Sequence, residues 1–386
     1  MKMWKRWIAA IGMLCGCGAG AAETAAPADI SRIDPNFAQE KIGDLPVCFV
    51  NVLDTAPFDL TGFPWRKPGG PLLRLPEELV NEPSPVNSGA RYLAWHTSGG
   101  AIRFRTDSRY IALRADLSAS PRDMDHMPRT GSSGFDIHLL RDGRWLFRSG
   151  AGPGPGELKK GRRFEAMLGR PWEKRAMREY ILNLPLYNSV SKLELGFEPG
   201  AKIEAPTPWR IPKPILFYGS SITQGGCASR PGNQYSTLLC RELDAPQINL
   251  GFSGSGKGEP AIAEAIAKLD LAAFVMDYDH NAPDAEYLQM THERFFKIVR
   301  QAHPELPILI LSGNLSPERT KIIKQTYENA VAAGDKHVYF IDGATFFADF
   351  PDRNQPTVDG THPTDLGFYF MYRTVLPVLK EALGLR

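Results

Sequence analysis

From residue 215 onward the sequence alternates between short apolar runs and helical stretches, and this alternation limits the fold more than any other feature. The apolar runs cover residues 215–218, 247–250, 272–277, 308–311 and 338–341. Helical stretches lie between them at 233–243, 259–268, 285–302 and 317–333, and a last helix begins near Thr364. Strands that alternate with helices predict a parallel sheet covered on both faces and joined by right-handed crossovers. We therefore expect a three-layer α/β/α sandwich over residues 215–386.

The preceding residues, 41–204, follow a different period. Ile102 and Phe104 alternate with Arg103 and Arg105, and similar alternations occur at 111–117 and 193–197. Period two, interrupted by turn residues, predicts antiparallel strands with one solvent-exposed face, as in a β-sandwich of jelly-roll-like form. Residues 205–214 contain four prolines, which predicts a stiff, extended linker between the two domains.

The length and charge balance of the chain limit the classes of molecule that it is expected to bind. The chain of 386 residues is long enough for two domains, each with its own core. Its 45 Lys and Arg residues nearly balance 43 Asp and Glu residues, and no basic run carries interleaved aromatic residues. We therefore expect no nucleic-acid partner, and a neutral small molecule or polymer as the ligand.

The first 22 residues have the pattern of an export signal. Lys2, Lys5 and Arg6 precede an apolar stretch at 7–14, and small residues fill 15–22. Two outcomes stay open: cleavage after Ala22, or processing at a lipoprotein-like box that leaves lipidated Cys17 as the only membrane contact. In both, residues 23–40 form a linker. The expected location is periplasmic or extracellular, with an outer-membrane lipoprotein as the second outcome.

Three cysteines remain beyond this signal: Cys48, Cys227 and Cys240. Their odd number and spacing fit no metal site. Cys227 and Cys240 are close enough in sequence to pair, but a domain of this size has a core and needs no cross-link. Separate, partly buried thiols are the favoured interpretation.

Polar residues follow most of the expected strands of the parallel sheet. Ser221 follows the first strand in a Gly-Ser-Ser turn, and a glycine-rich segment, 249–256, follows the second. Residues 277–281 follow the third strand, and 359–363 come after the fifth. The loops beyond the carboxyl ends of parallel strands converge on one crevice. A serine, a glycine-rich turn, an amide and an Asp/His pair are the groups of a serine hydrolase.

Each of these groups also has an ordinary explanation. Serine is common in tight turns because it bonds its own backbone there. The Asp-x-x-His spacing occurs three times, ending at His126, His280 and His362. His126, paired with Asp123, lies in the β domain far in sequence from Ser221, whereas His280, paired with Asp277, follows a strand and is the serious rival. The position of His362 after the last strand, with Pro363 suited to a first helical turn, favours His362.

The run from residue 219 to 232, Gly-Ser-Ser-Ile-Thr-Gln-Gly-Gly-Cys-Ala-Ser-Arg-Pro-Gly, resembles the first block of the SGNH (GDSL-like) hydrolases. Segments 134–138 and 178–187 are similar to the GxDLY domain that precedes one subset of them, with Ile137 and His138 in place of Leu-Tyr. The resemblance implies a flavodoxin-like strand order in the parallel sheet.

The resemblance also implies a set of site residues. Ser221 corresponds to the nucleophile, His362 to its base, and Asp359 to the carboxylate that orients the base. The backbone N–H groups of Ser221 and Gly254 and the Asn281 amide correspond to the oxyanion hole. Asp-His-Asn-Ala at 279–282 departs from the common Gly-x-Asn-Asp pattern.

The expected reaction is hydrolysis of short-chain esters through an acyl-serine, with no cofactor and no metal ion. Asp277, Asp279 and His280 could suggest a metal, but consecutive residues at a strand end point to opposite faces. Exported hydrolases of this subset resemble carbohydrate esterases, so the expected substrate is an acetylated carbohydrate. A short-chain lipid acylhydrolase and an inactive carbohydrate-binding protein are the alternatives. Five tryptophans could stack on sugars but are expected in the core: residues 65, 95, 145, 172 and 209.

Overall fold

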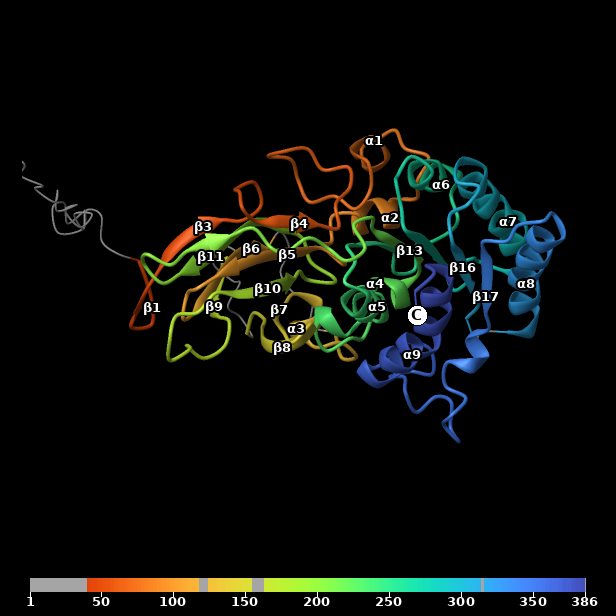
Figure 1. The fold of residues 1–386 in the computed structure, drawn as a ribbon. Coiled ribbons are helices and arrows are strands. Elements are labelled where there is room, and N and C mark those ends of the chain that lie inside the picture. The colour runs from red at the N-terminus through yellow and green to blue at the C-terminus, as the bar shows by residue number, and fades with distance from the viewer. Residues whose placement is uncertain (1–39, 118–123, 155–162, 314–315, 386) are drawn as a thin grey trace, which may run out of the picture. The chain divides into compact units, whose positions relative to one another are not determined.

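The computed structural model describes residues 40–117, 124–154, 163–313 and 316–385. The expected export signal, Cys17 and the linker up to residue 39 lie outside the described residues. The chain from Lys41 to Arg386 forms one compact unit. We call residues 41–204 the β part and residues 215–385 the α/β part (Figure 1). Within the described residues, no helix has the length and apolar character needed to cross a bilayer.

The β part contains two antiparallel sheets. One has the order β12-β5-β10-β7-β8, with β4 pairing β5: Ile203–Glu204, Ala101–Thr106, Arg178–Asn183, Phe135–Arg141, Arg144–Ala151 and Asp59–Thr61. The other has the order β3-β11-β6-β9: Cys48–Asn51, Val190–Phe197, Ile111–Leu117 and Arg163–Met167. Ile102 and Leu182 of the first sheet share one apolar core with Leu113 and Leu195 of the second. The expected β-sandwich is confirmed. A small hairpin, β1 (Lys41–Ile42) with β2 (Leu45–Pro46), precedes it.

The α/β part is built on a five-stranded parallel sheet in the order β14-β13-β15-β16-β17, which is flavodoxin-like, as expected. The strands are Gln247–Gly251, Ile215–Gly219, Ala273–Asp277, Ile308–Leu311 and Val338–Ile341. Its α-helices are α4 (Ser221–Gln224), α5 (Tyr235–Leu243), α6 (Pro260–Ile266), α7 (Ala285–Ala302), α8 (Pro317–Ala332) and α9 (Asp365–Ala382), with 3-10 turns η3 (Pro231–Asn233) and η4 (Gly343–Thr345).

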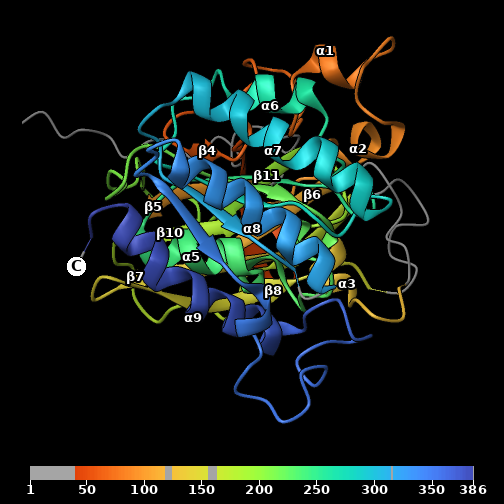
Figure 2. The same ribbon diagram turned by 90° about the vertical axis from the view of Figure 1, so that its right-hand side faces the viewer.

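Each strand of this sheet is buried on both faces, which explains its continuous apolar run. Leu216 and Tyr218 of β13 join the core under α6, α7 and α8. Ile215 and Phe217 of the same strand point the other way, into the core under α5 and α9. The result is the expected three layers, with the two groups of helices on opposite sides of the sheet (Figure 2).

The expectation of one solvent-exposed face is wrong for the sheet that contains β5. Arg103 is only 1% exposed, and its guanidinium donates to Glu179 Oε1 at 2.6 Å and lies 3.9 Å from the ring centre of Trp209. Asp136 of β7 is fully buried as well. The physical reason is that the α/β part and the segment before it cover this face, so its polar side chains are paired inside the protein rather than hydrated.

The β part also contains short helices that the period-two pattern did not predict: α1 (Glu77–Val80), α2 (Ser88–Leu93) and α3 (Arg129–Ser132). Leu73, Val80 and Leu93 belong to the apolar core of the α/β part. Among the tryptophans expected in a core, Trp65 and Trp172 do pack against one, whereas Trp95 is 42% exposed.

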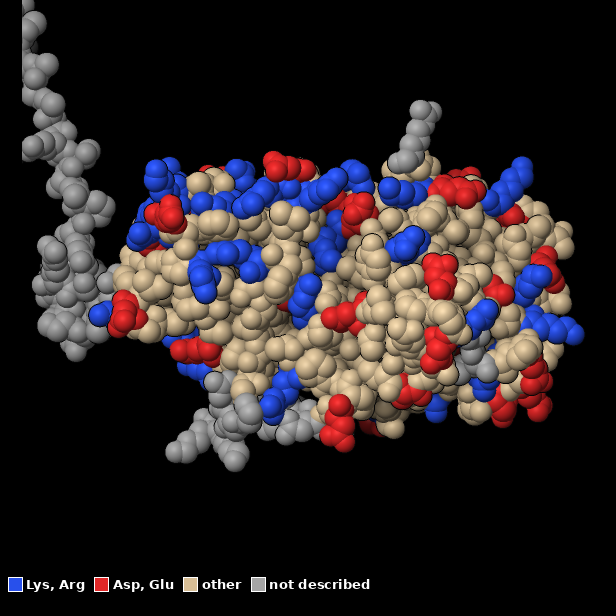
Figure 3. All heavy atoms as spheres, turned by 90° about the horizontal axis from the view of Figure 1, so that it is seen from below, with Lys and Arg blue, Asp and Glu red and all other residues tan. Residues whose placement is uncertain are grey.

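On the face shown in Figure 3, Lys and Arg side chains gather mainly over the β part. Several arginines of this part are paired with acids: Arg114 lies 2.5 Å from Glu165, and Arg163 lies 2.9 Å from Asp116. Paired charges of this kind leave a weaker field than unpaired ones. Cys48, Cys227 and Cys240 are free thiols, so the favoured interpretation of separate cysteines is confirmed.

Candidate active site

Ser221 is placed by a sharp turn between β13 and α4. Ser220 caps the helix, since its Oγ accepts a hydrogen bond from the Ile222 amide at 3.2 Å. A Cβ at Gly219 would lie 2.3 Å from both Asp277 O and Thr223 Oγ1, so only glycine fits at this turn. Ser221 is therefore the first residue of the helix, at the carboxyl edge of the parallel sheet, with 8% of its surface exposed.

His362 and Asp359 lie in line with this serine. Ser221 Oγ is 2.8 Å from His362 Nε2, and His362 Nδ1 is 2.7 Å from Asp359 Oδ2. Because a carboxylate only accepts hydrogen bonds, Nδ1 carries the ring proton and Nε2 is free to accept the serine proton. The structure thus brings together three residues from the two ends of the α/β part, in the order that general-base activation of a serine requires.

The loop that carries His362 is held by Asp359 itself. Asp359 Oδ1 accepts from the amides of Thr361 at 3.0 Å and His362 at 2.8 Å. Burial alone would raise the pKa of Asp359, but the hydrogen bonds from His362 and Thr361 outweigh it and lower that pKa to about 2. Asp359 is therefore a carboxylate at any pH near neutrality. Pro363 is outside α9, whose cap is Thr364, so the expectation that Pro363 starts the helix is wrong.

Three N–H donors of the described loops at this edge of the sheet have no acceptor within the protein. The Ser221 amide is at the first position of α4, where no helical acceptor exists, and Gly254 has φ +66° in the turn after β14. Asn281 Oδ1 accepts from the Gly256 amide at 3.2 Å, which leaves its Nδ2 to donate elsewhere. Within the described parts of the chain, no residue accepts a hydrogen bond from these three donors.

Glycine at 254 is explained by backbone conformation. A Cβ there would meet nothing within 4 Å, so crowding by the protein is not the reason. Its φ lies in the left-handed region, which other residues adopt only at a cost in energy. Gly256, in the same loop, does face a close approach: a Cβ there would lie 2.3 Å from Gly219 O. The loop is held to the turn of the nucleophile by the Phe252 amide, which donates to Gly219 O at 2.9 Å, and Asn281 is bonded to the same loop through the Gly256 amide.

The rival histidine, His280, does not reach Ser221. It forms an ion pair with Asp279, whose Oδ2 also accepts from the Gly313 amide at 2.5 Å. Burial would lower the pKa of His280, but the adjacent Asp279 carboxylate reverses this and raises it. Asp277 is hydrogen bonded to Thr223 at 2.8 Å and Tyr235 at 3.0 Å. The Asp277/His280 spacing therefore does not form a pair.

His126 is far in sequence from Ser221, yet it lies close to His362, the base that is bonded to the serine. Its ring centre lies 6.4 Å from that of His362. The turn that carries it is anchored by Met127, which is 4% exposed and packs in the core under α5 and α9. Asp125 and His126 themselves are exposed. Sequence distance gave no hint of this placement, and the partner Asp123 lies outside the described residues.

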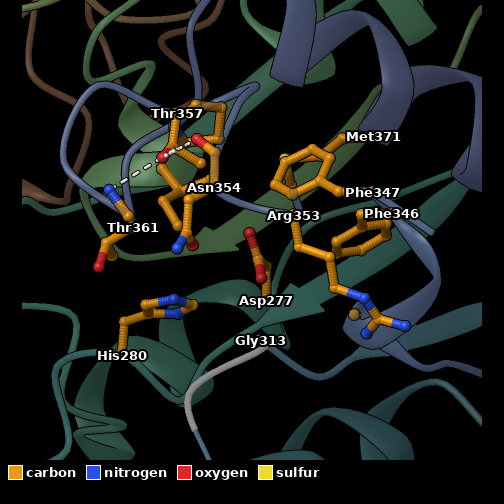
Figure 4. Close-up of a pocket in the computed structure, with 14 residues that line it drawn as sticks. Asp277, His280, Gly313, Phe346, Phe347, Arg353, Asn354, Thr357, Thr361 and Met371 are labelled. Atoms are coloured by element: carbon orange, nitrogen blue, oxygen red, sulfur yellow. Dashed lines mark hydrogen bonds between the residues drawn. The ribbon is translucent and has the colours of Figure 1, made fainter. Parts of the chain in front are cut away.

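A cavity of about 90 Å³ lies beside this arrangement, behind the loop of His362. In Figure 4, Thr361 and His280 line one side and Phe346, Phe347 and Met371 line the other, with Asp277 between them. The neighbours of the Ser221–His362 pair, Ile222 and Pro363, form part of its wall, rather than the pair itself. The cavity is thus adjacent to the candidate site and does not lie over the serine.

Comparison with known families identifies both parts of the chain. Residues 212–380 match the GDSL-like lipase/acylhydrolase family, and residues 47–203 match the GxDLY family, described as the N-terminus of esterases of the SGNH hydrolase type. The chain belongs to the SGNH (GDSL-like) hydrolases. Membership in this superfamily supports a hydrolytic esterase or acyl hydrolase. No curated protein matches the sequence significantly.

Solved structures agree with this assignment. A protein described as a GDSL-like lipase from Bacteroides ovatus is 28% identical, with a TM-score of 0.77 over 88% of this chain and 99% of that one. A salicylyl-acyltransferase from a tetracycline biosynthetic pathway is 20% identical, with a TM-score of 0.70 over 88% and 98%. An acetyl xylan esterase from the rumen bacterium Butyrivibrio proteoclasticus is 14% identical, with a TM-score of 0.59 over 87% and 99%. The last two establish a shared fold.

Proposed function

We propose that this SGNH hydrolase is a serine esterase that removes acetyl groups from carbohydrates through an acyl-serine intermediate. The observation that carries the proposal is the alignment of Ser221 Oγ, the His362 ring and the Asp359 carboxylate at 2.8 and 2.7 Å. Such an alignment is what a hydroxyl needs to lose its proton as it attacks a carbonyl carbon.

In the first half-reaction, Ser221 Oγ bonds to the ester carbonyl carbon while its proton moves to His362 Nε2. The carbonyl oxygen becomes an oxyanion, and the Ser221 amide, the Gly254 amide and Asn281 Nδ2 donate to it. The bond to the alcohol oxygen then breaks, and that oxygen takes the proton from Nε2. In the second half-reaction, water loses a proton to Nε2, attacks the acyl-serine and releases the carboxylic acid, and Ser221 regains its proton.

The carbohydrate substrate is supported by two observations. A neighbour of the same fold is an acetyl xylan esterase. In addition, the rim of the site nearest His362 carries the exposed polar residues Asp125 and His126, which suit a hydroxyl-rich alcohol better than a lipid chain. Lipid acyl hydrolysis and transfer of the acyl group to an acceptor alcohol are the alternatives that experiments must separate.

Hydrolysis rates for p-nitrophenyl acetate, butyrate and octanoate test this proposal. We expect kcat/KM to be highest for acetate and to fall with each longer acyl chain, since each added methylene that finds no apolar lining gains no binding energy. Product analysis should find free acetic acid even when glycerol is added as a competing acceptor. A maximum at octanoate would favour a lipid-directed enzyme, and acetylated glycerol as the main product would favour an acyltransferase.

His126 gives a test of the alcohol side. His362 hands its proton to the leaving alcohol, so a ring 6.4 Å away adjoins the alcohol part of the ester. We expect His126→Ala to raise KM for an O-acetylated xylo-oligosaccharide about 5-fold, the loss of about one hydrogen bond. The rate on ethyl acetate should stay within about two-fold, since its alcohol has no further hydroxyls.

Two variants accompany this measurement. His126→Gln keeps a side chain that donates and accepts hydrogen bonds, and should restore much of the affinity. His337→Ala removes a histidine just before β17, at the opposite edge of the sheet, and should change neither substrate. An equal loss on ethyl acetate and on the oligosaccharide would show that His126 does not bind the alcohol part.

A further inference from the structure

A short segment of the β part contacts the backbone of the candidate nucleophile, Ser221. It follows β10 and contains Leu186 and Tyr187, near the end of the GxDLY-like stretch 178–187. The Tyr187 amide donates to Ser132 O at 2.9 Å, and the Thr97 amide donates to Asn188 O at 3.0 Å. Both ends of this segment are therefore fixed by the backbone of the β part, independently of the α/β part.

The Tyr187 hydroxyl adjoins the two loops that carry the open amides. It donates to the Ser221 carbonyl oxygen at 3.3 Å, and the adjacent Ser253 side chain partly offsets the rise that burial causes in the pKa of the phenol. Burial raises the pKa of Tyr187, so the phenol stays protonated at neutral pH and keeps donating to Ser221. Ser253 directly precedes Gly254.

Gln224 connects the segment of the β part with the loop of Ser253. It is fully buried, and its Nε2 donates to Leu186 O at 3.1 Å while its Oε1 accepts from the Ser253 amide at 2.9 Å. Thus Gln224 ties the segment of the β part to the Ser253 loop by hydrogen bonds, and the Tyr187 hydroxyl lies near the same loop. The bond from the Ser253 amide to Gln224 limits how far the neighbouring Gly254 amide can move.

Gly226 is required for the Tyr187 contact. A Cβ at this position would lie 2.7 Å from the Tyr187 hydroxyl oxygen. Only glycine lets the phenol reach the Ser221 carbonyl, which also accepts from the Gly226 amide at 2.8 Å. The Gly-Gly pair of the nucleophile segment and the tyrosine of the β part are therefore complementary in shape.

We propose that Tyr187 is a positioning residue that sets the separation between the Ser221 and Gly254 amides, and that the β part thereby preorganises the oxyanion hole. The inference rests on the proposed function, since it assumes that these amides bind an oxyanion. Donors stabilise a developing charge fully only when they are already in place at the moment of reaction. A tyrosine anchored in a rigid sandwich holds both loops without contacting the substrate.

The test is Tyr187→Phe, which removes the hydroxyl and keeps the ring. We expect kcat for p-nitrophenyl acetate to fall about 10-fold or more, because small displacements of catalytic groups cost large factors in rate. KM should stay within about two-fold, since the oxyanion contact forms only in the transition state. Tyr180→Phe is the matched control: Tyr180 is a buried tyrosine of the same part, bonded to Trp172 at 3.1 Å. It should lower the melting temperature and leave kcat unchanged.

A double-mutant cycle separates positioning from general loss of stability. Ser253→Ala should lower kcat by a factor similar to that of Tyr187→Phe, and the double variant should lose no more than the larger single loss. A wild-type kcat in Tyr187→Phe, or losses that multiply in the double variant, would overturn the inference. Should Tyr187→Phe fail to fold, Ser253→Ala alone must still lower kcat. A wild-type enzyme that hydrolyses no ester would instead overturn the proposed function.

Discussion

Replacing Ser221 with alanine is expected to lower kcat for p-nitrophenyl acetate by ~10⁴-fold or more, because no other group can take over the attack on the carbonyl carbon. The fold should be unaffected. Ser221 Oγ bonds His362, and the cap of α4 is provided by Ser220. Steady-state hydrolysis of the variant, with melting temperature and circular dichroism measured beside it, checks both expectations.

Ser220→Ala is the matched control, since it alters the adjacent hydroxyl. It removes the bond from the Ile222 amide to Ser220 Oγ, the loss of a helix cap, which costs about 1 kcal/mol. We expect a lower melting temperature but a kcat within a few-fold of wild type. The opposite result, an active Ser221→Ala and an inactive Ser220→Ala, would assign the nucleophile to Ser220 and reopen the role of His280.

The strands of the α/β part could be predicted almost to the residue, because each is buried on both faces and leaves a continuous apolar run. The expected run 338–341 coincides with β17, and the helix expected at 285–302 coincides with α7. Once the parallel sheet was predicted, the rule that loops converge at the carboxyl ends of strands placed Ser221 and His362 on the same edge. Their hydrogen bond could not be derived from sequence spacing. The Asp-x-x-His spacing that ends at His362 also ends at His280, so spacing alone does not choose between the two histidines.

The errors arise where one part of the chain covers the other. Alternation in β5 shows that Arg103 points away from Phe104, but it cannot show what lies beyond Arg103. The structure places Trp209 and Glu179 there, so the arginine is buried and paired instead of hydrated. The approach of His126 to His362 has the same origin, because it depends on how a turn of the β part packs on the α/β core.

The same packing explains why the signature of the β part has polar residues on a strand. Asp136 is fully buried, and its carboxylate accepts from Arg230 Nη1 at 2.8 Å and the Gly232 amide at 3.0 Å. Arg230 and Gly232 lie in the run that follows Ser221. Two stretches of sequence that lie far apart in the chain are thus two sides of one contact. In this enzyme the β part holds the nucleophile segment at Asp136 and again at Tyr187.

Truncating Asn281 to alanine is expected to lower kcat by ~10²- to 10³-fold, the usual effect of removing one oxyanion donor. The amide is oriented for this task, because its Oδ1 accepts from Gly256 at 3.2 Å and its Nδ2 is left to donate. KM for p-nitrophenyl acetate should change little, since the ground-state carbonyl bonds weakly compared with the oxyanion. Stopped-flow measurement of acyl-enzyme formation and decay should find both steps slowed, because each passes through an oxyanion.

Asn281→Asp tests the two ends of the Asn281 amide separately: Nδ2 as the donor to the oxyanion, and Oδ1 as the acceptor that bonds the Gly256 amide. Aspartate keeps an oxygen for the Gly256 amide but replaces the donor with a negative charge beside the oxyanion, so we expect a larger loss of kcat than in Asn281→Ala. Asn329→Ala is the control. Asn329 lies on α8, and its side-chain amide donates to Glu293 of α7, so its loss should leave kcat unchanged. If Asn281→Ala retains wild-type kcat, Asn281 has no part in the mechanism, and the Ser221 and Gly254 amides must stabilise the oxyanion without it.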